Sequence, residues 1–103
     1  MPKFTFKTVK PIGRWKSFEN DQFLIKLNKC EVGYFSTQDA FQNGPFKIHL
    51  MILKNEEDLK KNPSSDWKWI ILKKEFETLD LAKSFLNDNF DAINKLNLKL
   101  LCQ

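Results

Sequence analysis

The chain has 103 residues and a formal net charge of +4, and this length predicts that residues 1–103 form one small domain. Aromatic residues make up 14% of the chain, which excludes a disordered protein because disordered chains lack the side chains needed for a core. No apolar run approaches the roughly 18–20 residues of a transmembrane helix, and no secretory signal is visible, so we expect a cytoplasmic protein without a membrane partner.

The first half of the chain shows the alternation of apolar and polar residues that a strand with one buried face requires. This alternation predicts strands over residues 3–7, 23–27, 30–35 and 46–53. Asn28 and Lys29 lie between the second and third strands, where asparagine tolerates the positive φ of a two-residue hairpin turn. Residues 11–13 break the regular pattern, residues 14–18 are expected to form a loop or a short irregular strand, and residues 36–45 have the composition of a loop.

The second half begins with a polar segment, residues 55–66, for which we expect an exposed loop or at most one helical turn. Alternation then returns and predicts a strand over residues 67–72 that continues to Phe76. Apolar residues next recur at helical spacing after Thr78, a good helix N-cap. Asn87-Asp88-Asn89 has poor helix propensity, so this segment is either one helix or two short ones.

The predicted fold class is therefore α+β: an antiparallel sheet of about four to five strands, with one C-terminal helix, whole or broken, packed on one face. Leu98, Leu100 and Leu101 are expected to close the chain as an edge strand. The segment 76–85 is similar to the strand-to-helix junction of small DNA-binding sheet domains of the integrase arm-binding type, in which a three-stranded sheet enters the major groove. That resemblance covers about a tenth of the chain, and similar junctions occur in many unrelated folds.

The two cysteines, Cys30 and Cys102, lie far apart in the sequence and form no C-x-x-C motif. We expect both to be free thiols, as is usual in the reducing cytoplasm.

The positive charge is concentrated in one half of the chain. Residues 1–54 hold nine Lys or Arg against four Asp or Glu, and the remainder holds eight against nine. If the apolar strand residues, including Trp67, Trp69 and Ile71, all face the helix, strand parity collects a basic stripe on the opposite face. Its members are Lys3, Lys7, Lys26, Lys47, His49 and Lys68, mixed with Leu24, Met51, Leu53 and Ile70.

Two readings of this stripe remain open. Mixed basic and aliphatic surfaces are common in recognition, but lysines also fill exposed sheet faces and discourage aggregation. Arg14-Trp15-Lys16 adds an aromatic residue between two cations in a loop. This tripeptide is suited to stacking on a base or gripping a protein pocket, and equally to closing one end of the core.

Catalytic and metal-binding motifs are weak. His49 is the single histidine and has no other ligand at suitable spacing. Glu56, Glu57 and Asp58 with Asp66-Trp67-Lys68 only loosely match a Mg²⁺-dependent nuclease. No activated nucleophile or glycine-rich phosphate loop is present, so we expect no enzyme, metal or small-molecule cofactor.

We therefore expect a non-catalytic binding domain whose partner is a nucleic acid or a nucleoprotein complex, with Arg14, Trp15, Lys16, Lys26, Lys47, His49 and Lys68 as binding residues. The alternative is a small protein-binding inhibitor or regulator, of the kind that phages and mobile elements encode, which occludes a site on a larger protein.

Overall fold

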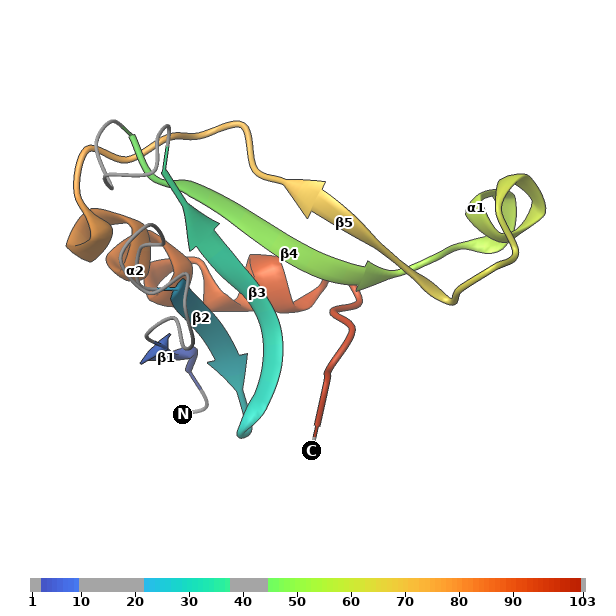
Figure 1. The fold of residues 1–103 in the computed structure, drawn as a ribbon, viewed down its shortest axis with the longest axis horizontal. Coiled ribbons are helices and arrows are strands. Elements are labelled where there is room, and N and C mark those ends of the chain that lie inside the picture. The colour runs from blue at the N-terminus through green and yellow to red at the C-terminus, as the bar shows by residue number, and fades with distance from the viewer. Residues whose placement is uncertain (1–2, 10–21, 38–44, 103) are drawn as a thin grey trace, which may run out of the picture.

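The computed structural model describes residues 3–9, 22–37 and 45–102, and one antiparallel sheet dominates it (Figure 1). The strands are β1 (Thr5–Val9), β2 (Gln22–Leu27), β3 (Cys30–Ser36), β4 (Lys47–Leu53) and β5 (Trp67–Ile71). They form a five-stranded sheet in the order β1-β2-β3-β4-β5. The helices are α1 (Glu56–Lys61), α2 (Leu79–Asp88) and α3 (Phe90–Asn94). The predicted α+β class is confirmed.

Local sequence signals account for the hairpin between β2 and β3. Asn28 and Lys29 both have positive φ, 52° and 68°, as the predicted two-residue turn requires. The register then shifts by one residue, because Ile25 pairs with Gly33 whereas Lys26 pairs with Glu31. Such a bulge bends the strand and increases its twist.

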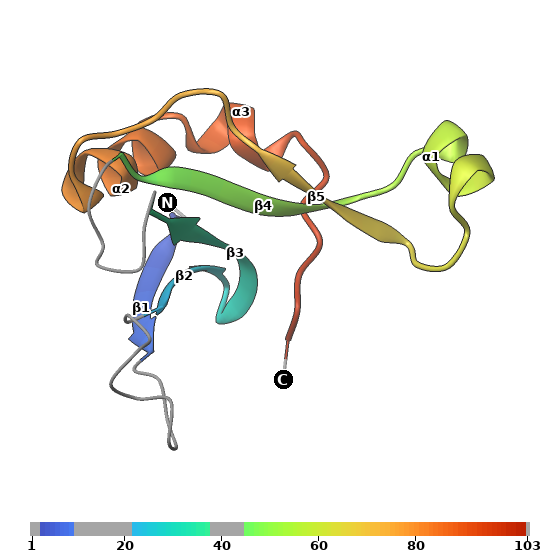
Figure 2. The ribbon, with the colours of Figure 1, turned by 45° about the horizontal axis from the view of Figure 1, so that its top comes forward.

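Helices α2 and α3 lie together on one side of the sheet (Figure 2). The Thr78 hydroxyl accepts a hydrogen bond from the Leu81 N–H and caps α2, and the helix breaks at Asn89, which separates α2 from α3. Two short helices are therefore present, one of the two predicted alternatives. They contribute Ala82, Leu86 and Ile93 to a buried cluster that also contains Phe4, just before β1, and the sheet residues Ile25, Leu27, Val32, Phe35, Ile48 and Leu50.

The connection from β4 to β5 forms an arm that projects from the body and carries α1 at its tip (Figures 1 and 2). The prediction of a loop or at most one turn was wrong here. Asn55 and Asp58 form a capping box, in which each side chain accepts a hydrogen bond from the backbone N–H of the other. The Lys68 ammonium lies 2.8 Å from the Asp58 carboxylate and ties α1 to β5. No residue of α1 is buried.

The C-terminal segment differs from the predicted edge strand. Leu98 and Leu101 form only isolated bridges, to Ile52 of β4 and Glu31 of β3. The prediction was wrong because the segment does not pair with β1 or β5, the edge strands of the sheet. It bonds instead to β3 and β4, beyond the point where the pairing of these two strands ends. The predicted extension of the 67–72 strand to Phe76 was also wrong. This strand, β5, ends at Ile71, and Phe76 forms a lone bridge to Phe46.

Cys30 and Cys102 are joined in a disulfide, with their Cα atoms 4.4 Å apart. The expectation of two free thiols was therefore wrong. The sequence separation of 72 residues hides this proximity, which depends on the path of the C-terminal segment across the sheet.

Among the residues that the structure describes, no helix is long and apolar enough to cross a membrane.

Candidate binding face on the outer side of the sheet

The sheet face that points away from α2 and α3, here called the outer face, carries an aromatic cluster. Strand pairing places Tyr34 opposite His49, His49 opposite Ile71, and Met51 opposite Trp69. Cross-strand partners lie on the same face of a sheet, and the intervening residues Phe35, Ile48 and Leu50 are buried in the core. Tyr34, His49 and Trp69 therefore project together from three adjacent strands.

The orientation of β5 reverses the prediction. Trp67, Trp69 and Ile71 were expected to face the helices, but Trp69 and Ile71 are 46% and 57% exposed. The even-numbered Ile70 and Leu72 pack against the core instead. The even-numbered residues Ile70 and Leu72 are as apolar as the odd-numbered residues Trp69 and Ile71. Alternation alone therefore could not decide which set is buried.

This reversal removes Lys68 from the predicted basic stripe. Lys68 pairs with Ile52, on the opposite face from His49, and its ammonium bonds to Asp58. The side-chain hydrogen bond from Lys68 is the main reason that the pKa of Asp58 is lowered. Lys68 therefore fixes the arm and does not contribute to the outer face.

The aromatic rings of the outer face form a continuous chain of contacts. The Tyr34 ring stacks on the His49 ring, with centroids 4.4 Å apart and planes within 8° of parallel. Tyr34 also meets Trp69 edge to face at 5.2 Å, and Trp69 meets Trp67 edge to face at 5.3 Å. Edge-to-face and stacked geometries are the preferred ones for aromatic pairs, so the four rings hold one another in place.

His49 is held on this face by a second contact, a 2.6 Å hydrogen bond between its Nε2 and the Ser36 hydroxyl. Ser36 pairs directly with Lys47, and so lies diagonal to His49 across β3 and β4. Burial, and secondarily the charge of Lys47, lower the pKa of His49. The imidazole is therefore mainly neutral at pH 7.

A serine hydroxyl bonded to an imidazole is also the first half of a hydrolytic triad. A working triad needs a carboxylate that orients the other ring nitrogen. Within the described part of the chain, His49 interacts with Ser36, the Tyr34 ring and the charge of Lys47, and with no carboxylate. The pair lies on an open sheet face, where its clearest role is to fix the imidazole under Tyr34.

Three lysines share the outer face with the aromatic cluster. Lys7 alternates with the core residue Phe6 on β1, Lys26 lies between buried Ile25 and Leu27 on β2, and Lys47 begins β4. Lys7 and Lys47 are exposed, and Lys26 is half-buried. Lys47 has one acidic neighbour, Glu75, at 4.0 Å with both side chains about half exposed, and such a surface pair contributes little energy.

The remaining predicted residues lie elsewhere. Lys3 precedes β1 and lines a hollow at the junction of α2 and α3, so it does not belong to the outer face. Arg14, Trp15 and Lys16 lie outside the described residues. Met51 belongs to this face by register but is only 2% exposed, so it supports the surface from below.

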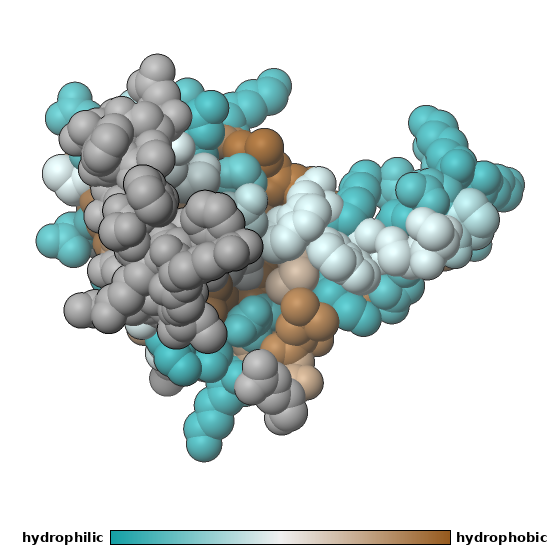
Figure 3. Space-filling view, in the orientation of Figure 1, coloured by the Kyte–Doolittle hydropathy of each residue, from teal (hydrophilic) through white to brown (hydrophobic). Residues whose placement is uncertain are grey.

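Hydropathy changes along the arm, from its tip toward the body of the molecule. The tip of the arm is strongly hydrophilic, and paler and brown residues follow it toward the body (Figure 3). Sequence reasoning missed Tyr34, Trp67 and Trp69 as site residues. The β4–β5 register identifies the two tryptophans, because it aligns odd-numbered residues of both strands on one face, and the β3–β4 register adds Tyr34 opposite His49.

No group of three or more His, Cys, Asp or Glu side chains is placed to hold a metal ion in the described part of the chain. The comparisons with known proteins add no assignment: no family model matches this sequence, and no curated protein or solved structure matches it.

Proposed function

We propose that this protein binds single-stranded nucleic acid through the outer face. The observation that carries the proposal is the combination, on one face, of the Tyr34, His49, Trp67 and Trp69 rings with Lys7, Lys26 and Lys47. Aromatic side chains on a sheet offer flat surfaces on which unpaired bases stack, while lysines attract the phosphates. In a duplex the faces of the bases are already stacked, so this arrangement favours a single strand.

Trp69 is the residue on which this binding mode depends most. It is the most exposed of the four rings, at 46%, since the other three are partly buried, and it contacts two of them. Stacking of one base on an aromatic side chain contributes about 1–3 kcal/mol. Loss of the ring in Trp69→Ala should therefore weaken binding by roughly 5- to 150-fold.

The test is fluorescence anisotropy with labelled single-stranded DNA, single-stranded RNA and duplex DNA at low salt. Leu81→Ala is the matched control, because Leu81 is also a large exposed apolar residue, 53% accessible, but lies on α2. The proposal requires tighter binding to single strands than to the duplex, with a loss in Trp69→Ala that Leu81→Ala does not show. Equal losses in both variants, or no binding to any nucleic acid, would contradict it.

A protein partner is the second candidate, and the aliphatic part of the outer face favours it. Ile71 and Leu53 are 57% and 42% exposed beside the tryptophans, and exposed apolar patches of this kind are typical of protein interfaces. A regulator that occludes a site on a larger protein would use Ile71 as well as Trp69. Ile71→Ala would then weaken capture of that partner, whereas an aliphatic side chain adds little to base stacking.

The expected cytoplasmic location stays a prediction. The Cys30–Cys102 bridge weighs against it, because structural disulfides persist mainly in oxidising compartments. Thiol titration of protein isolated under conditions that block exchange would decide whether the bridge forms where the protein is made.

A further inference from the structure

Strands β3 and β4 separate part of the way along their length. Their pairing runs from Ser36–Lys47 to Gly33–Leu50 and stops there. Beyond this point Cys30–Val32 of β3 and Met51–Leu53 of β4 no longer face each other as partners. The C-terminal segment, residues 97–102, runs from β4 past the end of this pairing toward the C-terminus (Figures 1 and 2).

The C-terminal segment satisfies the backbone groups that the separation leaves open. The Leu53 N–H donates to the Asn97 carbonyl at 2.8 Å, and the Lys99 N–H donates to the Met51 carbonyl at 2.9 Å. Leu101 and Glu31 exchange two hydrogen bonds, each of 2.9 Å. One short segment therefore replaces the missing β3–β4 pairing on both strands.

Apart from these bonds, the segment has one apolar anchor, Leu98, which is partly buried against the core. Leu100 and Leu101 are 40% and 45% exposed, so they bury only part of their apolar surface. The Lys99 ammonium lies 3.1 Å from the Asp66 carboxylate, whose side chain is 64% exposed, and an exposed ion pair contributes little. Beyond Leu98, the segment therefore depends on its backbone bonds and on the covalent attachment at its end.

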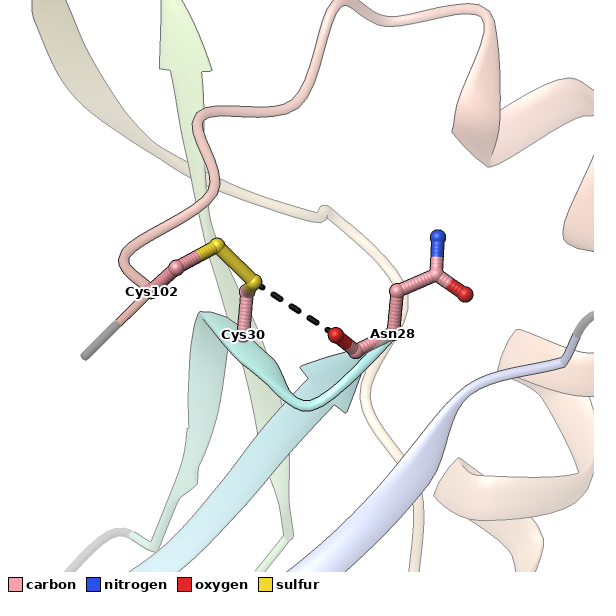
Figure 4. Close-up of a disulfide and its surroundings, with 3 residues drawn as sticks. All are labelled: Asn28, Cys30 and Cys102. Carbon is pink, nitrogen blue, oxygen red and sulfur yellow. Dashed lines mark hydrogen bonds between the residues drawn. A yellow bond between two sulfur atoms is a disulfide. The ribbon is translucent and has the colours of Figure 1, made fainter.

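That attachment is the disulfide (Figure 4). Cys30 is the first residue of β3, 7% exposed, and its sulfur lies 3.5 Å from the Asn28 carbonyl oxygen. Cys102 is exposed. The bridge therefore joins a fixed point on the β2–β3 hairpin to an accessible residue at the end of the segment.

We propose that the Cys30–Cys102 disulfide is a redox latch whose reduction releases residues 97–102 and opens the separation between β3 and β4, while the rest of the sheet stays folded. This proposal is independent of the nucleic-acid proposal, because it rests on the backbone bonds of the C-terminal segment and not on the outer face. The opened state would present the N–H groups of Glu31 and Leu53 and the carbonyls of Glu31 and Met51. Unpaired strand groups of this kind accept an extended backbone.

The chemistry requires a dithiol as the reductant. One thiolate of the dithiol attacks the Cys102 sulfur, the S–S bond breaks, and Cys30 leaves as a thiolate that takes up a proton. In the mixed disulfide, the reductant's first sulfur is bonded to Cys102. The second thiol of the reductant attacks that first sulfur, and Cys102 leaves as a thiolate that takes up a proton. Two electrons and two protons pass to the protein, and the reductant becomes a disulfide.

The alternative is a structural staple, whose removal either changes nothing locally or unfolds the whole domain. Amide hydrogen exchange separates these cases because it reports the opening of single hydrogen bonds. The experiment compares the full chain before and after treatment with dithiothreitol, with the gain of two hydrogens confirmed by mass. The reporting amides are Leu53, Lys99, Glu31 and Leu101, and the reference amides are Ile25, Ile48 and Leu50 in the buried strands.

The latch predicts that reduction lowers the protection of the four reporting amides by at least about tenfold and leaves the reference amides unchanged. The Cys30→Ser/Cys102→Ser variant should show the same low protection with or without dithiothreitol. Retained protection of the reporting amides in the reduced protein would overturn the proposal. A parallel loss at the reference amides, or two titratable thiols in air-oxidised protein, would overturn it equally.

Discussion

Gly33 lies where β3 and β4 make their last contact before they separate. A Cβ at this position would overlap the His49 carbonyl oxygen and lie 3.1 Å from the Leu50 Cα. These are backbone atoms of a strand held on both sides, so they cannot move aside cheaply. Gly33→Ala should therefore destabilise the protein by about 1–3 kcal/mol, the usual cost of an overpacked core. Urea unfolding measures this loss as a lower midpoint.

Thr5→Ala is the control for Gly33→Ala, because Thr5 is an exposed strand residue on β1. Its effect should stay within about 0.5 kcal/mol, as for most surface substitutions. An unchanged midpoint in Gly33→Ala would mean that β3 and β4 can move apart, and that the close approach is not a constraint on the fold.

At the scale of single residues, the sequence identified the chemistry that local patterns determine. Asn28 and Lys29 have the predicted positive φ because the turn depends only on its own backbone. The cysteines were misjudged because their pairing depends on where a distant segment lies. The hydrogen bond between Ser36 and His49 was equally invisible, since the two residues meet only through the β3–β4 register.

At the scale of elements, α1 and α2 are stabilised in different ways. Both have a side-chain N-cap, Asn55 for α1 and Thr78 for α2, but only α2 has buried residues. Loss of an N-cap costs about 0.5–2 kcal/mol. Thr78→Ala should lower the global unfolding free energy by about this amount, because α2 packs on the core.

Asn55→Ala should instead unwind α1 and leave the global midpoint unchanged, because no residue of α1 is buried in the core. Amide exchange at Leu59 and Asn62, whose N–H groups donate to Asn55 and Asp58 carbonyls, reports this local opening. A lower urea midpoint in Asn55→Ala, comparable to that of Thr78→Ala, would show that the arm is coupled to the core.

The elements that sequence could predict are those with a single buried face. In β2 and β4 every core-facing position is apolar and the outer positions include lysine or histidine, and α2 carries a cap followed by apolar residues at helical spacing. β5 was predicted as a strand but turned the wrong way, since even-numbered Ile70 is as apolar as its neighbours Trp69 and Ile71. α1 was missed as a helix because its polar composition gives no periodicity, although the Asn55–Asp58 capping box was present in the sequence.

At the scale of the whole molecule, one side of the sheet forms the hydrophobic core and the other is exposed. The side that faces α2 and α3 contains the buried cluster, and the outer face carries the exposed rings and three lysines. Strand parity predicted a basic stripe on the outer face, but it assigned Trp67 and Trp69 to the side that faces the helices. The position of the tryptophans depends on the register of β4 against β5. The side-chain pattern of β5 does not specify that register, because neighbouring residues at its centre are all apolar.

The salt dependence of binding tests whether the lysines of the outer face contact phosphates. Three phosphate contacts, from Lys7, Lys26 and Lys47, give a log–log slope of about −2 for a single strand, or roughly 20-fold weaker binding between 50 and 200 mM salt. Lys47→Glu should weaken binding and make the slope shallower by about 0.7. Lys95→Glu is the matched control, because Lys95 is an exposed lysine at the end of α3, on the helix side. An equal effect of both substitutions would show that net charge attracts the nucleic acid without a defined site, whereas an effect of Lys47→Glu alone places the phosphates beside the Tyr34, His49 and Trp69 rings.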